Sequence, residues 1–200
     1  SVTLKNVILD DNGIHKGTYF AQTNTKSVSE SNLDFVQDSM ITAHGLENRA
    51  VYITLDDGAE LRNFGGMSAL YGTTNVHITM KAGSKVTAPD VADRAKSDPK
   101  NPPEGETGAA GAVWLQGSEF TMEADAVIED VVGRAIYADG GSATISGTIR
   151  NITGDKEMWQ GQNGTAIHLR GNAQVTMTGS AACIEEMKGN GSSTVFVEGS

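Results

Sequence analysis

The stretch R-A-I-Y-A-D-G-G-S-A-T-I-S-G-T-I-R-N-I-T-G, from Arg134 to Gly154, decides the fold because it holds one complete unit of a repeat. Three short runs with regularly placed apolar residues follow one another in it, at 135–138, 143–145 and 149–152, and glycines separate the runs. A helix would need apolar residues at i, i+3, i+4 and i+7 over ten or more positions. Alternating runs of three to five residues predict β-strands instead, three to a unit.

The same unit recurs along the chain on both sides of this stretch. Its first run begins with a small residue, and equivalents start 23, 31 and 28 residues apart, at Ala112, Ala135, Ala166 and Thr194. Upstream, Ala50–Ile53 and Ala69–Gly72 match this first run, and Leu61–Phe64 matches Ile149–Ile152. Recurrence at such intervals indicates a solenoid, in which each unit is one coil that stacks on its neighbours.

The type of solenoid follows from the consensus sequences that are missing. The Leu/Asn consensus of leucine-rich repeats and the G-G-x-G-x-D spacing of calcium-binding repeats are both absent. The remaining fold is all-β, a parallel β-helix with three short strands per coil and loop insertions. We expect it to be right-handed, because crossovers between parallel strands almost always have that hand.

The sequence predicts one continuous β-helix over residues 1–200, with regular and irregular parts. Irregular coils are expected over 1–48 and regular coils over 49–87 and 111–199. All four prolines lie between, and proline cannot donate to a sheet ladder, so 88–110 is predicted to be an inserted loop. A shorter insertion is expected at 155–163. Since the repeat starts and stops in mid-pattern, we expect a fragment of a longer polypeptide with further coils or domains.

The unit from Arg134 to Gly154 resembles the repeats of the pectin-lyase-like right-handed β-helices found in large bacterial surface and adhesin-like proteins. The resemblance covers about residues 49–199. It implies an extracellular location, secreted or on the bacterial cell surface. It does not imply one activity, since this fold serves polysaccharide lyases, glycoside hydrolases, tailspikes, adhesins and passive stalks.

Charge and hydropathy exclude some partners. The chain has 25 acidic and 15 basic residues, a formal charge of −10, and no cluster of Lys or Arg. Nucleic-acid phosphates and anionic membrane surfaces would be repelled, so we expect no nucleic-acid partner. No apolar run reaches 18 residues, so we expect no direct insertion into a membrane.

Strand alternation divides each coil into inward and outward side chains. The residues predicted to form the core are Val113, Leu115, Phe120, Met122, Ile136, Ile145, Ile149, Ile152, Ile167, Leu169, Val175, Met177 and Ile184. In the first run of each coil, the residue between two inward positions is aromatic or histidine. These outward residues form a candidate binding column: Tyr52, Tyr71, Trp114, Tyr137, His168 and Phe196.

The candidate column has two interpretations. Rings on neighbouring strands about 4.8 Å apart can stack on one another, as a structural ladder covered by the proline-rich loop and the insertion that carries Trp159. Alternatively, the rings form an open platform that stacks on sugar rings or receives an apolar partner. Quenching of Trp114 fluorescence would distinguish the two, since a buried ring indicates the ladder and an accessible ring indicates the platform.

No catalytic or metal-binding set is identified. The pairs Glu129-Asp130 and Glu185-Glu186 align on either side of Arg150-Asn151, which predicts an ion-pair ladder. Asp10-Asp11 and Asp56-Asp57 precede turn residues and are interpreted as turns. His168 is more consistent with a packed imidazole than with an acid–base group. The four histidines have no metal-ligand spacing, so neither a metal nor another cofactor is expected.

A second outward column consists of threonines in the middle run of each coil. Its members are Thr54, Thr79, Thr121, Thr144 and Thr176. Such a column is a feature of ice-binding surfaces, but Lys81, Glu119 and Glu123 would roughen and charge the same face. Ice binding is therefore disfavoured.

Taken with the resemblance, these features favour a non-catalytic β-helix of the bacterial cell surface, an adhesin or binding module for glycans or host glycoproteins. The first alternative is a polysaccharide lyase or glycoside hydrolase. The second is a passive structural stalk. An enzyme should bring three or more acidic or basic groups into one cleft, whereas a stalk should have a uniformly solvated exterior.

Overall fold

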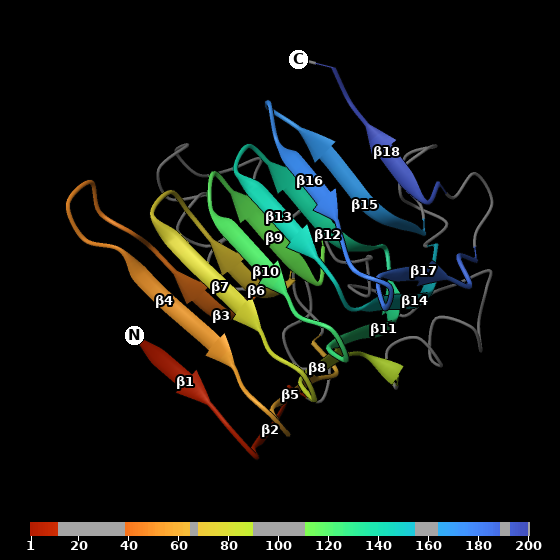
Figure 1. Cartoon of the computed structure of the whole chain (residues 1–200), viewed down its shortest axis with the longest axis horizontal. Helices are drawn as coiled ribbons and strands as arrows, with labels where there is room; N and C mark the ends of the chain where they lie inside the picture. Colours follow the sequence, from red (N-terminus) through yellow and green to blue (C-terminus); the bar gives the residue numbers. More distant parts are fainter. Residues whose placement is uncertain (12–38, 65–67, 90–110, 155–163, 189–192, 200) are drawn as a thin grey trace, which may run out of the picture.

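The computed structural model describes residues 1–11, 39–64, 68–89, 111–154, 164–188 and 193–199. These residues form a right-handed parallel β-helix of six coils (Figure 1). Each coil gives one short strand to each of three sheets, and every strand pair between coils is parallel. The predicted fold class is confirmed. Most of the expected loop 88–110 and all of the insertion 155–163 lie outside the described residues.

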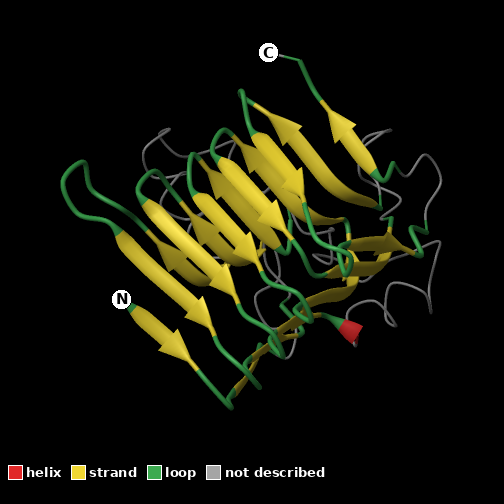
Figure 2. Cartoon of the chain, viewed as in Figure 1, coloured by secondary structure: helices red, strands yellow, loops and turns green. Residues whose placement is uncertain are grey.

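The three six-stranded sheets run along the stack, and we call them sheets A, B and C (Figure 2). Sheet A contains β1 (Val2–Leu4), β4 (Val51–Leu55), β7 (Val76–Met80), β10 (Glu119–Met122), β13 (Ser142–Ile145) and β16 (Gln174–Met177). Sheet B contains β2 (Ile8–Asp10), β5 (Glu60–Arg62), β8 (Lys85–Thr87), β11 (Val127–Val132), β14 (Thr148–Thr153) and β17 (Cys183–Glu185). Sheet C contains β3 (Ser39–Ala43), β6 (Ser68–Gly72), β9 (Val113–Gln116), β12 (Arg134–Asp139), β15 (Thr165–Arg170) and β18 (Val195–Val197).

The core is a narrow apolar column enclosed by the three sheets. In sheet B, Leu61, Ile128 and Ile149 lie in one row across neighbouring coils, and none of the three exposes measurable surface. Nine predicted core residues are buried: Val113, Leu115, Phe120, Met122, Ile136, Ile145, Ile149, Ile152 and Ile167. Leu169, Val175 and Ile184 are half-buried, and Met177 is 40% exposed, because all four lie in or beside the outermost coil.

A left-handed residue recurs in sheet B directly after the row that contains Arg62, Glu129 and Arg150. Asn63, Asp130, Asn151 and Glu186 all have φ between 53° and 56°, the left-handed region that asparagine and aspartate tolerate best. Asn63 and Asn151 directly follow Arg62 and Arg150, which occupy one row of sheet B, and this confirms the predicted match of Leu61–Phe64 with Ile149–Ile152. At Asp130 and Asn151 this conformation bends the chain within β11 and β14, whose next residues still pair with each other.

One alignment from the sequence is wrong. Ala50–Ile53 was matched with the first run of each coil, which forms sheet C, but β4 pairs with β1 and β7 in sheet A. Strands of all three sheets alternate with the same period, so alternation alone does not assign a strand to a sheet. At the N-terminus, β1, β2 and β3 form a sixth coil.

Candidate functional site

Sheet C brings five of the six candidate binding residues into one row. Its register places Tyr71, Trp114, Tyr137, His168 and Phe196 directly opposite one another on successive strands. Successive ring centroids are 4.6, 6.0, 5.0 and 4.9 Å apart in that order. All four contacts are within the range of favourable aromatic packing, so the rings form a continuous ladder along the stack.

Tyr52 does not belong to this ladder. It lies in β4 of sheet A, where its ring stacks on His77 with centroids 4.8 Å apart, and it is 51% exposed. Thr42 of β3 occupies the position in sheet C that the sequence assigned to Tyr52. His44 completes the ladder instead, with its ring edge-on to Tyr71 at 5.9 Å. His44 lies two positions beyond Thr42, the residue of β3 that faces Tyr71, so the repeat pattern did not predict its contact with the ladder.

Three rings of the ladder are buried, and the row does not form an open platform. Tyr71 is 3% exposed, Trp114 8% and His168 1%, whereas Tyr137 and Phe196 are half-buried. The rings therefore point away from the core of the coils and still have little contact with solvent. The insertions that were expected to cover them, with Trp159, lie outside the described residues.

Polar side chains surround the C-terminal half of the ladder. The guanidinium of Arg134 lies over the Tyr137 ring, 4.8 Å from its centroid, and Nη1 of Arg170 donates a 3.3 Å hydrogen bond to the Tyr137 hydroxyl. His168 Nε2 lies 3.2 Å from Oε2 of Glu198. The repeat pattern does not indicate that Arg134, Arg170 or Glu198 neighbours the ladder, because Arg134 precedes Tyr137 on the same strand and the other two lie outside the aligned row.

The electrostatics around His168 do not suit acid–base catalysis at neutral pH. Burial, helped by the positive charge of Arg134, lowers the pKa of His168 to about 4, although Glu198 opposes this shift. Burial likewise lowers the pKa of Arg134 to about 10, and it raises the pKa of Tyr137. The imidazole is thus neutral at pH 7 and almost fully enclosed, as the packed interpretation of His168 predicts.

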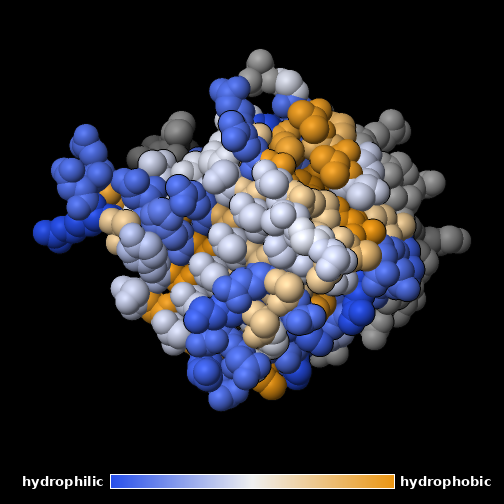
Figure 3. Space-filling model, in the orientation of Figure 1, coloured by the Kyte–Doolittle hydropathy of each residue, from blue (hydrophilic) through white to orange (hydrophobic). Residues whose placement is uncertain are grey.

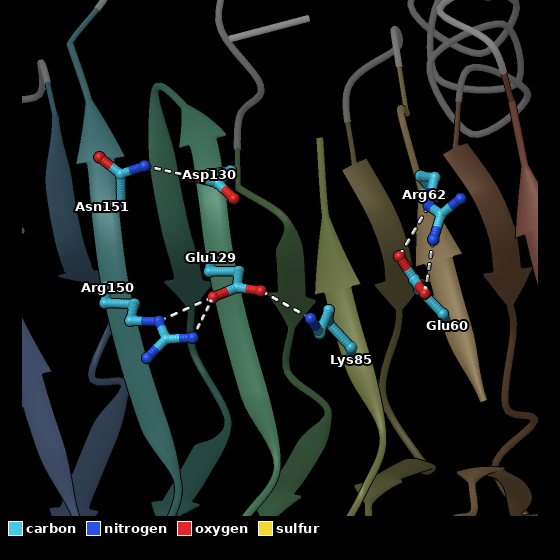
Figure 4. Close-up of polar contacts among 7 residues, drawn as sticks. All are labelled: Glu60, Arg62, Lys85, Glu129, Asp130, Arg150 and Asn151. Carbon is cyan, nitrogen blue, oxygen red and sulfur yellow. Dashed lines mark hydrogen bonds and ion pairs between the residues drawn. The ribbon is translucent and has the colours of Figure 1, made fainter. Parts of the chain in front are cut away.

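The ion-pair ladder predicted for sheet B is present at Glu129, which contacts Lys85 and Arg150 (Figure 4). Glu129 lies opposite Arg150, which lies opposite Glu185. Oε1 of Glu129 is 2.7 Å from Lys85 Nζ, and its Oε2 is 2.6 Å from Arg150 Nη2. Burial alone would raise the pKa of Glu129, but Lys85 and Arg150 outweigh it and lower the pKa. Because the Glu129 carboxylate is ion-paired with both Lys85 and Arg150, it is not available as a catalytic base.

A turn position of sheet B carries a second set of polar contacts. The side-chain amide of Asn151 donates to the carboxylate of Asp130, and Lys188 Nζ donates to Asn151 Oδ1 at 2.9 Å. In the N-terminal coils, Arg62 makes a two-pronged contact with Glu60, at 2.7 and 2.9 Å. These groups link or brace individual coils, and none converges with the others on one point.

The outward face of sheet A carries a row of six threonines. Strand register places Thr54, Thr79, Thr121, Thr144 and Thr176 in line, as predicted, and adds Thr3 of β1. The parallel row on the same face reads Tyr52, His77, Glu119, Ser142 and Gln174. His77 Nδ1 lies 2.8 Å from Glu119 Oε2, so the two side chains pair across the strands.

Within the described ranges, no three His, Cys, Asp or Glu side chains come together as a metal site would require. Over the same ranges, no helix is long and apolar enough to cross a membrane.

The fold and the register together define a parallel β-helix with ladders of like side chains along its sheets. Comparison of the chain with protein family models, with curated proteins and with solved structures gave no match.

Proposed function

We propose that this chain is a non-catalytic β-helix of the pectin-lyase-like type, from a secreted or surface-exposed bacterial protein, and that it binds glycans or host glycoproteins. The parallel β-helix supports the resemblance seen in the repeat from Arg134 to Gly154. Adhesin-like surface proteins use such solenoids to present an extended face to a ligand.

One observation carries the proposal: the outward chemistry repeats from coil to coil. Threonine recurs at one position in all six strands of sheet A, and charged groups on sheet B alternate in sign along the stack. A repetitive surface suits a repetitive ligand, such as a glycan. An active site would instead concentrate unlike groups around one reacting bond.

The buried ladder of sheet C limits where a ligand could bind. Tyr71, Trp114 and His168 have too little exposed surface to stack on a sugar ring. Only Tyr137 and Phe196, both half-buried, offer part of a ring face in that row. Binding through the ladder of sheet C is therefore limited to Tyr137 and Phe196, whereas Tyr52 is exposed on sheet A.

The test is a glycan and glycoprotein array run with the purified chain, alongside assays for new reducing ends and unsaturated products. Saturable binding without products is the expected result. Product formation would replace this function with that of a lyase or hydrolase. A chain that binds no array member and cleaves none would be a passive stalk, and the proposal would be wrong.

A further inference from the structure

The outward face of sheet A is a surface on which a ligand could contact every coil. It lies in front in Figure 1, and pale colours of intermediate hydropathy cover its middle in Figure 3. The threonine row runs across it from Thr3 to Thr176. At about 4.8 Å per strand, five intervals span roughly 24 Å.

The last two strands of this face, β13 and β16, carry neutral, exposed side chains. Ser142 lies opposite Gln174, and Thr144 lies opposite Thr176, with Thr178 just beyond. All five side chains are exposed, and each carries a hydroxyl or an amide that donates and accepts hydrogen bonds. Sugar hydroxyls have the same dual capacity, so such a surface can match them without a fixed order of donors and acceptors.

The charged groups of the face lie on its first four strands and on the turns that follow them. Asp56 Oδ2 lies 3.8 Å from Lys5 Nζ and 3.7 Å from Lys81 Nζ. Glu119 contacts the His77 ring, and Tyr52 stacks on the other side of that imidazole. With Glu119 and Glu123 on the same face, acidic groups are at least as numerous as the two lysines, so a polyanion would gain nothing from it. A neutral ligand is the chemistry that this charge pattern fits.

We propose that sheet A is a track for a linear neutral polysaccharide that runs along the stack, across the strands. This inference rests on the proposed function and names its surface and ligand. The threonine hydroxyls contact successive sugar units, because the spacing of the strands is close to the length of one unit in an extended chain. Tyr52, half-exposed beside the row, adds an apolar ring face at the N-terminal end.

Ice is a poorer match for the same row. The side chain of Glu119 is 65% exposed and that of Lys81 is 44% exposed, and both rise from this face. A rigid crystal plane cannot bend around such charges, whereas a single sugar chain can lie between them. Thermal hysteresis is therefore expected to be absent.

The experiment measures binding of soluble glucomannan and hydroxyethyl cellulose, with polygalacturonate as the charged control, by calorimetry and affinity electrophoresis. The main variant, Thr121→Val/Thr144→Val, keeps the side-chain shape and removes two hydroxyls. We expect the dissociation constant for a neutral polysaccharide to rise at least about tenfold. Thr148→Val makes the same change on sheet B and should leave it unaltered.

The outcomes separate the track from the wider function. Wild-type affinity in Thr121→Val/Thr144→Val, with the chain still binding a neutral polysaccharide, would overturn the track and leave the function standing elsewhere on the molecule. No binding of either neutral polysaccharide by the wild type would overturn the track, and the glycan array would then decide the function. If the double variant unfolds, Thr121→Ser/Thr144→Ser replaces it, and loss of binding in that hydroxyl-retaining variant would contradict the proposal. Preferred binding of polygalacturonate, or ice growth inhibited by the row, would overturn it as well.

Discussion

Trp114 and Tyr52 are both outward aromatic residues on strands, yet their surroundings differ. Trp114 packs between Tyr71 and Tyr137 and is 8% exposed, whereas Tyr52 touches one imidazole and is 51% exposed. Alternation identified both side chains as outward. It carried no information about what covers them, because burial of an outward ring depends on contacts made outside its own strand.

Replacement of Trp114 by Ala should lower the free energy of unfolding by about 3–5 kcal/mol, since a large buried ring leaves a cavity. Tyr52→Ala is the matched control and should cost about 1 kcal/mol, mainly the stacking on His77. Chemical denaturation followed by circular dichroism measures both. Equal and small losses in the two variants would mean that Trp114 is not packed.

His168 should make stability depend on pH. Its pKa is lowered to about 4 in the folded chain, below the value of about 6.5 in unfolded chains. The unfolded state therefore binds more protons between these values, and stability falls as the pH drops from about 6.5 towards 4, by roughly 3 kcal/mol. The charged groups facing the imidazole are Arg134, Arg170 and Glu198.

His168→Phe should weaken this dependence, because phenylalanine keeps a ring between Tyr137 and Phe196 and cannot be protonated. Thermal melts of the two proteins at intervals from pH 7 to pH 4 provide the comparison. Parallel curves for the variant and the wild type would contradict the assigned environment of His168.

At the scale of strands, the sequence predicted most of sheets A, B and C correctly from Leu61 onward. Before Leu61, β4 was assigned to the wrong sheet, because Val51–Leu55 fit the alternation of any sheet. The repeated Arg-Asn pair indicated the strand register more clearly than the apolar residues did. It occurs at 62–63 and at 150–151, and in both places the asparagine has a positive φ.

The ion-pair ladder of sheet B should contribute measurably through Glu129. Its side chain is 12% exposed and contacts both Lys85 and Arg150, so Glu129→Gln should cost about 1–3 kcal/mol at pH 7. The loss should shrink as the pH falls below the unfolded pKa of about 4.3 and through the lowered pKa of Glu129 in the folded chain, because the carboxylate stabilises the fold only where it is ionised.

Glu119→Gln is the control for this ladder, since Glu119 has a 65% exposed side chain and a single partner on sheet A. Its cost should stay below about 1 kcal/mol. Urea titrations at pH 7 and pH 3 measure both variants. A Glu129→Gln protein as stable as the Glu119→Gln protein would show that the ladder is only a solvated surface feature.

At the scale of the whole molecule, stability should decrease from the central coils outward. Val2, Ile8, Met177, Val195 and Val197, all in the two outermost coils, are between 40% and 69% exposed. Met177, the one predicted core residue that is exposed, lies in one of these coils, because alternation assigns a direction and not the number of neighbouring coils. The ligand could not be predicted from the core either, because alternation indicates only which side chains point inward or outward.

Hydrogen exchange measures this gradient directly. Amides of β9, β12 and β10, which pair with strands on both sides, should exchange more slowly than those of β1, β2, β17 and β18. Uniform protection across all coils would contradict a stack whose stability depends on nearest neighbours.

The composition of the candidate site could be predicted in part. Five of the six column residues lie together in sheet C, and the threonine row lies together in sheet A. The polar groups near Tyr137 could not be predicted, since Arg134 and Arg170 reach that ring from flanking positions. Ladders follow from register, whereas diagonal contacts depend on side-chain conformations that the repeat does not encode.

The most direct test of the central claim, binding without turnover, uses the array glycan that the chain binds most tightly. The glycan is incubated with an excess of the chain, recovered, and analysed for length by size-exclusion chromatography and for new reducing or unsaturated ends. We predict a saturable complex and a glycan whose length distribution is unchanged after prolonged incubation. Progressive shortening with new ends in proportion to the amount of chain would contradict the account.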